Sequence, residues 1–168
     1  LTADVMESWW PTGQFLAAIM EDFIRGNVEK YGPRGTNEYP FNIDKMIPLK
    51  YNEGALAESW EVDADKIVLH IRKGVKWSGI SVNPGVMEAR EYTADDAVWN
   101  LHRLFQSEKY PEWNRSGHVK SLDSIYATDK YTVVIETEYF HPEWWWYIAN
   151  GKGCLQYAPE VIEAGSSD

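Results

Sequence analysis

The chain has 168 residues, 44% of them hydrophobic and 25% charged, and its formal net charge is −10. This length and composition are typical of a single soluble globular domain that buries a real core. The acidic balance, without a run of Lys and Arg, argues against nucleic acid and anionic membranes as partners, because both attract clustered cations. Nine Trp and ten Tyr make the chain rich in aromatic side chains, which fill cores and also line ligand clefts.

Cysteine content and hydropathy do not identify the cellular compartment of the protein. Cys154 is the only cysteine, so no disulfide can form within this sequence. The longest apolar run, residues 15–20, is far shorter than the roughly 20 residues of a membrane-spanning helix. The sequence starts at Leu1 rather than Met, so we expect a processed or trimmed form, for which the lack of a visible signal peptide is uninformative.

The first predicted element is a helix in which apolar residues recur at helical spacing from Phe15 to Ile24. Thr12 can cap its start, and Gly26 is expected to end it. Residues 27–53 then carry several Gly and Pro among polar residues, which predicts a long irregular connection with room for one short strand.

A β-hairpin is predicted over residues 56–71. Residues 56–62 read as a strand, residues 63–66 as a turn, and residues 67–71 as a second strand. In the second strand Ile67, Leu69 and Ile71 share one face, and His70 points to the other.

The central part of the chain predicts a helix followed by another hairpin. Thr93 is expected to cap the helix, with Asp95 and Asp96 in its first turn, where acidic groups favour the positive end of the helix dipole. An aromatic-containing loop follows to about residue 120. Residues 125–127 and 131–136, joined by an Asp-Lys turn, predict the hairpin.

Two short helices complete the prediction. Pro142 is expected to start a helix that contains residues 144–146, three consecutive Trp that cannot all share one side because neighbours are about 100° apart. Pro159 starts a last helix that ends near Gly165. Helices and hairpins alternate without regular βαβ units. The predicted fold class is α/β of the mixed α+β kind, with a largely antiparallel or mixed sheet and flanking helices.

The sequence offers no pattern specific for catalysis or metal binding. Its four His residues do not follow a metal-binding spacing, and there is no Gly-x-Ser-x-Gly elbow or phosphate-binding loop. Asp95 and Asp96 resemble a carboxylate pair, but their position in a first helical turn favours a structural role. Cys154, without an evident His partner, is interpreted as a buried structural thiol. We therefore expect a protein that is not an enzyme and needs no cofactor.

Several segments together resemble the family 5 extracellular solute-binding proteins, which are the dipeptide-, oligopeptide- and nickel-binding receptors of ABC importers. The resemblance covers most of residues 55–165, in the order and spacing of the family. It is carried by residues 56–62, 69–77, 92–98 with Arg103, 128–135 and 158–160. The chain departs from the family pattern by an insertion between Gly79 and Tyr92, and family members are much longer and two-lobed.

The resemblance implies a lobe of the type II periplasmic-binding-protein kind, incomplete here, with residues 1–168 forming part of the N-terminal lobe. It implies capture of peptides or related solutes, delivery to an ABC permease, a monomer, and a periplasmic or extracellular location with membrane association of the parent protein. Ligands of such receptors are held between two lobes that close on them.

By order along the chain, three segments are expected to face the ligand cleft. Their candidate ligand-binding residues are Trp9, Trp10, Trp113, Lys152, Gly153 and Cys154. Peptides would be held largely through their backbone, whereas sugars would stack on the Trp rings. An oligosaccharide receptor of the same family and a self-contained, aromatic-rich carbohydrate-binding module therefore remain as alternatives.

Overall fold

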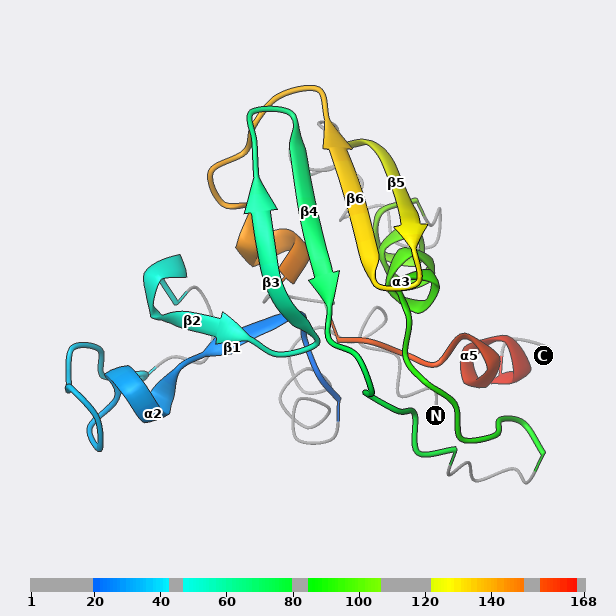
Figure 1. The fold of residues 1–168 in the computed structure, drawn as a ribbon, viewed down its shortest axis with the longest axis horizontal. Coiled ribbons are helices and arrows are strands. Elements are labelled where there is room, and N and C mark those ends of the chain that lie inside the picture. Colours follow the sequence, from blue (N-terminus) through cyan, green and yellow to red (C-terminus); the bar gives the residue numbers. More distant parts are fainter. Residues whose placement is uncertain (1–19, 43–46, 80–84, 107–121, 150–154, 166–168) are drawn as a thin grey trace.

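A four-stranded antiparallel sheet with the strand order β3-β4-β6-β5 forms the main layer (Figure 1). The computed structural model describes residues 20–42, 47–79, 85–106, 122–149 and 155–165. The strands are β3 (Ala57–Val62), β4 (Lys66–Ile71), β5 (Leu122–Asp129) and β6 (Thr132–Thr137). Both predicted hairpins are confirmed, and the pairing of β4 with β6 joins them into one sheet.

The two faces of this sheet differ because side chains alternate along each strand. Leu69 and Ile71 of β4 are buried, and His70 between them lies on the other face, as predicted. The register pairs Leu69 with Val133 of β6, so apolar residues of neighbouring strands meet on the buried face. Helix α3 (Ala94–Gln106) packs against β5 and β6 there, and Figure 1 shows it behind the sheet.

A one-turn π-helix, Trp145–Ala149, and helix α5, Pro159–Gly165, follow the sheet in the chain. Trp144 is 4% exposed and lies edge-on to Trp60 of β3, with ring centroids 6.4 Å apart. Trp145 and Trp146 are only partly buried. The expectation that the three consecutive Trp cannot all face one way, with at least one in the core, is therefore confirmed.

A second, two-stranded sheet contradicts one predicted boundary. Strand β1 (Ile24–Gly26) pairs with β2 (Asn52–Gly54), so the predicted helix does not extend to Ile24. The carbonyl of Phe23 accepts from the amides of Ala55 and Ala57, and this long-range backbone pairing overrides the helical spacing of the apolar residues. The rest of the predicted helix, up to residue 19, lies outside the described residues.

The connection between β1 and β2 contains more regular structure than the sequence predicted. It holds helix α2 (Val28–Tyr31) and a 3-10 turn (Leu49–Tyr51). Tyr51 stacks on Tyr39 at a centroid distance of 4.7 Å and meets Tyr31 edge-on at 5.3 Å. These ring contacts hold the connection as an arm beside the main sheet (Figure 1).

Candidate functional site

A pocket of about 630 Å³ lies where the two sheets approach each other. This volume falls within the usual range for small-molecule sites. Apolar groups such as Leu56 and Trp77 line it together with the charged side chains of Arg25 and Lys76. The lining residues are 20–22, Arg25, 55–56, 75–78, Tyr92 and 155–156.

Three consecutive residues, Arg90, Glu91 and Tyr92, hold the walls of this pocket together; they are called the 90–92 segment below. Its backbone runs antiparallel to the wall formed by residues 75–77. The amide of Tyr92 donates to the carbonyl of Val75, and the amide of Trp77 donates to the carbonyl of Arg90. The side chains of the segment then reach three different parts of the chain.

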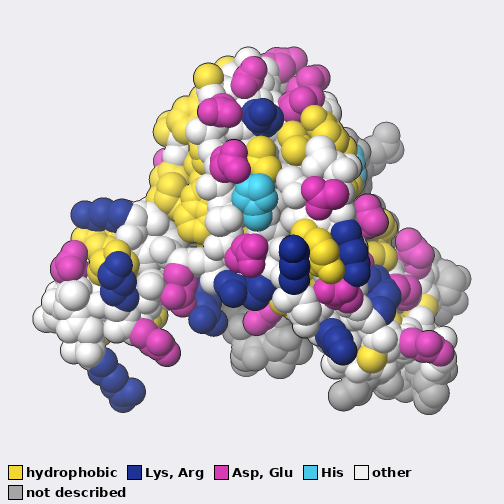
Figure 2. All heavy atoms as spheres, viewed as in Figure 1, with side chains coloured by type: hydrophobic (Ala, Val, Ile, Leu, Met, Phe, Trp, Pro, Cys, Tyr) yellow, Lys and Arg dark blue, Asp and Glu magenta, His cyan; other side chains and the backbone are white. Residues whose placement is uncertain are grey.

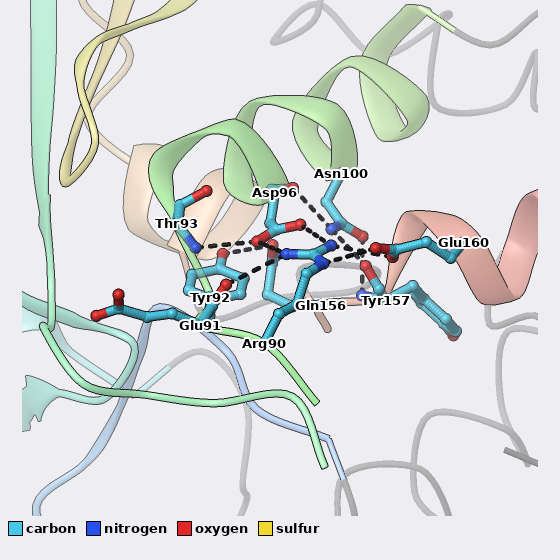
Figure 3. A network of polar contacts seen from close by, with 9 residues as sticks. All are labelled: Arg90, Glu91, Tyr92, Thr93, Asp96, Asn100, Gln156, Tyr157 and Glu160. Carbon is cyan, nitrogen blue, oxygen red and sulfur yellow. Dashed lines mark hydrogen bonds and ion pairs between the residues drawn. The ribbon is translucent and has the colours of Figure 1, made fainter. Parts of the chain in front are cut away.

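Arg90 ties helices α3 and α5 together (Figure 3). Its guanidinium makes paired hydrogen bonds with the carboxylate of Asp96, at 2.7 and 2.8 Å, and with that of Glu160, at 2.6 and 2.9 Å. Asp96, 4% exposed, also accepts from the amide of Thr93 at the start of α3. These bonds, first with Asp96 and then with Glu160, raise the pKa of Arg90, and Arg90 lowers that of Glu160. Arg90 therefore carries its charge at any relevant pH.

Tyr92 forms part of the pocket floor. Its side chain is buried, its ring lies edge-on to Trp77 at 5.5 Å, and its hydroxyl donates to Oε1 of Gln156 at 2.9 Å. Burial, and then the nearby charge of Asp96, raise the pKa of Tyr92 well above its ordinary value. The hydroxyl consequently stays protonated and acts as a hydrogen-bond donor.

Asn100 fixes the neighbouring wall to helix α3. Its side-chain amide donates to the carbonyl of Tyr157 and accepts from the amide of the same residue, both at 2.9 Å. It also donates to the carbonyl of Asp96 one turn earlier. Figure 3 shows these bonds between Asn100 and Tyr157, which resemble the pairing of two strands. They hold the chain next to Leu155 and Gln156, which line the pocket.

Glu91 connects the 90–92 segment to the main sheet. Its carboxylate accepts from Nζ of Lys130 at 2.6 Å, from the amide of Gly74 at 2.9 Å and from the hydroxyl of Tyr131 at 3.0 Å. These donors, with Lys130 the strongest, lower the pKa of Glu91 to about 2. The β5–β6 turn and the loop after β4 are therefore joined through one carboxylate.

The described residues contain no group of three or more His, Cys, Asp or Glu side chains placed to hold a metal ion. Asp96 forms a salt bridge with Arg90 at 2.7 Å, in agreement with its predicted structural role. Within the same residues, no helix is long and apolar enough to span a bilayer.

The six candidate ligand-binding residues from the sequence, Trp9, Trp10, Trp113, Lys152, Gly153 and Cys154, lie outside the described residues and stay predictions. The next residues after Cys154, Leu155 and Gln156, line the pocket. Sequence reasoning missed the pocket contributions of Trp77, Tyr92 and Gln156. Trp77 and Tyr92 belong to the stretches that carried the family resemblance, but nothing in their spacing indicated a shared pocket.

Comparison with known families gives a match over most of the described fold. The model of the bacterial extracellular solute-binding proteins, family 5 Middle, matches residues 53–163, about two thirds of the chain. This family consists of solute-binding components of transport and not of enzymes, and its description places it outside the cell. No curated protein matches the sequence.

Solved structures show a similar fold at low sequence identity. One is DppA from Helicobacter pylori in complex with the peptide STSA, with a TM-score of 0.66, 19% identity, and coverage of 96% of this chain and 30% of that one. Another is Haemophilus influenzae OppA in complex with RPPGFSPFR, with a TM-score of 0.63, 18% identity, and coverage of 94% and 28%.

A third is MoaA from A. tumefaciens in complex with mannopinic acid, with a TM-score of 0.64, 22% identity, and coverage of 94% and 27%. The chain thus spans less than a third of the length of these structures. The likeness confirms the expected fold class, a mixed α/β arrangement of the type II periplasmic-binding-protein kind, as part of a larger fold.

Proposed function

Because the chain belongs to the family 5 bacterial extracellular solute-binding proteins, we propose that it is part of the N-terminal lobe of a receptor that captures peptides for an ABC importer. The observation that carries this proposal is the family match over residues 53–163, which include every pocket-lining residue from Ala55 to Gln156. The peptide complexes of DppA and OppA support the ligand class. The activity belongs to the whole receptor, of which this chain would form one part.

The pocket is proposed as the contribution of this lobe to the ligand cleft. A peptide carries charged ends, polar backbone groups and varied side chains. The pocket combines charges of both signs, Glu21 and Lys76 among them, with the apolar surfaces of Leu56 and Trp77. Trp9, Trp10, Trp113, Lys152, Gly153 and Cys154 are retained as further ligand contacts in this proposal.

The mechanism proposed is closure of two lobes on the ligand. A ligand that contacts both lobes only in the closed state shifts the population toward that state, and the closed receptor delivers it to the permease. The receptor would act as a monomer without a cofactor or catalytic activity, outside the cytoplasmic membrane and attached to its surface.

A second ligand class is favoured by one comparison. MoaA, 22% identical, is described in complex with mannopinic acid. Mannopinic acid, an oligosaccharide or a related polar ligand would use the same mixture of aromatic and charged lining. The self-contained carbohydrate-binding module is the weaker alternative, because the related structures extend far beyond the region that this chain matches.

Calorimetric titration of the intact receptor with trialanine, a mixed peptide pool, mannopinic acid and an oligosaccharide panel tests the ligand class. We expect peptide binding, weakened by Lys76→Glu, because Lys76 lines the pocket. A tenfold loss corresponds to about 1.4 kcal/mol of binding free energy. Lys66→Glu is the matched control, since Lys66 lies on strand β4 outside the pocket. Binding of the non-peptide ligands alone would contradict the peptide assignment, and equal effects of the two substitutions would contradict the assignment of the pocket.

A further inference from the structure

Acidic and basic side chains gather at opposite ends of the main sheet, although the net charge of the chain is negative. Acidic groups gather at the upper end in Figure 2, over the β3–β4 turn with Asp63 and Asp65. Lys and Arg gather at the lower end, where β4 ends and β5 turns into β6. The sequence alone did not reveal this cluster because its members come from segments far apart in the chain.

The centre of the basic end is a group of four residues, Arg72, Lys73, Lys130 and Tyr131, called the basic patch below. The Nζ atoms of Lys73 and Lys130 lie 5.4 and 5.2 Å from the centre of the Tyr131 ring. The three cationic residues are exposed. An aromatic ring between two cations offers both contact area and charge, and Tyr and Arg are common in the energetic centres of protein interfaces.

The charges of the basic patch are only partly neutralised. Lys130 pairs with Glu91 at 2.6 Å. The guanidinium of Arg72 donates to the carbonyls of Ala55 and Gly54, at 2.8 and 3.2 Å, and so is held in place by neutral groups. Among the described residues, no carboxylate forms a salt bridge with Arg72 or Lys73. The three cations lie beside two carboxylates, Glu91 and Asp129, the latter accepting from the amide of Tyr131 at 2.8 Å, so a small positive excess remains on an acidic protein.

The loop that carries Lys73 is held by a hydrogen bond and continues into the pocket. Glu91 binds the amide of Gly74, the residue after Lys73, and so fixes the loop that follows β4. The next residues of the same loop, 75–78, line the pocket. A surface whose side chains are already ordered loses little entropy when it binds.

We propose that the basic patch is a docking surface for an acidic protein partner, whose carboxylates would pair with Arg72 and Lys73. Resting on the proposed function, this partner is the membrane-embedded part of the importer. A protein partner fits better than an anionic bilayer, because the net charge of −10 is repelled by a uniformly anionic plane. A localised acidic surface can approach the patch to within the screening length of about 8 Å at physiological salt, where the attraction between exposed charges is strongest.

Binding of the intact receptor to the importer's membrane subunits in neutral-lipid proteoliposomes tests this proposal. The variants are Lys73→Glu and Lys73→Arg. Lys50→Glu is a matched control, because Lys50 is exposed and lies 4.6 Å from the ring of Tyr51 on the arm. At low salt, Lys73→Glu should lower the association rate constant about tenfold, Lys73→Arg should preserve it, and the deficit should shrink at about 0.5 M salt.

Equal losses for Lys73→Glu and Lys50→Glu would show an effect of net charge alone and would overturn the proposal, as would no loss for Lys73→Glu. Wild-type binding to importer-free vesicles of anionic lipid, as strong as to the importer, would assign the patch to lipid and also overturn it. Titration of the same proteins with trialanine separates the two proposals. Failure of the wild type to bind trialanine and the peptide pool would contradict the peptide function. The docking measurement does not depend on that result and tests the basic patch separately.

Discussion

Substitution of Asn100 tests how the pocket wall at residues 155–157 is held. Asn100 is 7% exposed and makes reciprocal hydrogen bonds with the backbone of Tyr157. Asn100→Ala removes the amide partner of two buried main-chain groups, each of which costs about 1–3 kcal/mol when its bond is lost. Because local relaxation recovers part of this cost, we expect a decrease in unfolding free energy of about 2–4 kcal/mol. Urea denaturation followed by Trp fluorescence measures it.

Asn100→Asp provides the sharper comparison. Its carboxylate can still accept from the amide of Tyr157 but faces the carbonyls of Tyr157 and Asp96, to which Asn100 donates. We expect Asn100→Asp to be destabilised at neutral pH. Its deficit relative to the wild type should narrow as the pH falls, because a protonated carboxyl can donate a hydrogen bond. A loss below about 1 kcal/mol for Asn100→Ala, or a deficit of Asn100→Asp that does not vary with pH, would refute the assigned role.

Three further predictions concern the surrounding structure. Glu91 has a folded pKa of about 2 against an ordinary 4.5, so its stabilising effect is complete above pH 4.5 and is lost as the pH falls toward 2. In Glu91→Gln the urea unfolding midpoint should therefore vary less with pH in this range than it does in the wild type. The same pH dependence of the midpoint in both proteins would contradict the role of Glu91. Gly54→Ala would place a Cβ 2.3 Å from the carbonyl oxygen of Ala57, and a cost of about 1–3 kcal/mol is expected from thermal or urea unfolding. Trp144→Ala should cost about 3–5 kcal/mol, whereas Phe140→Ala, at a 45% exposed site, should cost under about 1; equal losses would contradict the core assignment.

Local sequence patterns determined most of the secondary structure. Alternation in residues 67–71 placed Leu69 and His70 on opposite faces, and the structure agrees because a strand has a side-chain period of two. Asp96 was expected in the first turn of a helix. There its carboxylate accepts a hydrogen bond from the amide of a neighbouring residue, Thr93. The motifs in residues 56–160 also sufficed to identify the family, since they preserve order and spacing along the chain.

Only the tertiary structure decided which distant groups meet. Arg90 and Glu160 are separated by seventy positions, and no periodicity links them. Ile24 likewise pairs with Gly54, about thirty positions away, and this pairing of β1 with β2 makes a strand where local spacing predicted a helix. The pocket and the basic patch arise in the same way. A sequence pattern records the neighbours within one element, whereas these two sites depend on contacts between elements that form only when the sheets and helices pack.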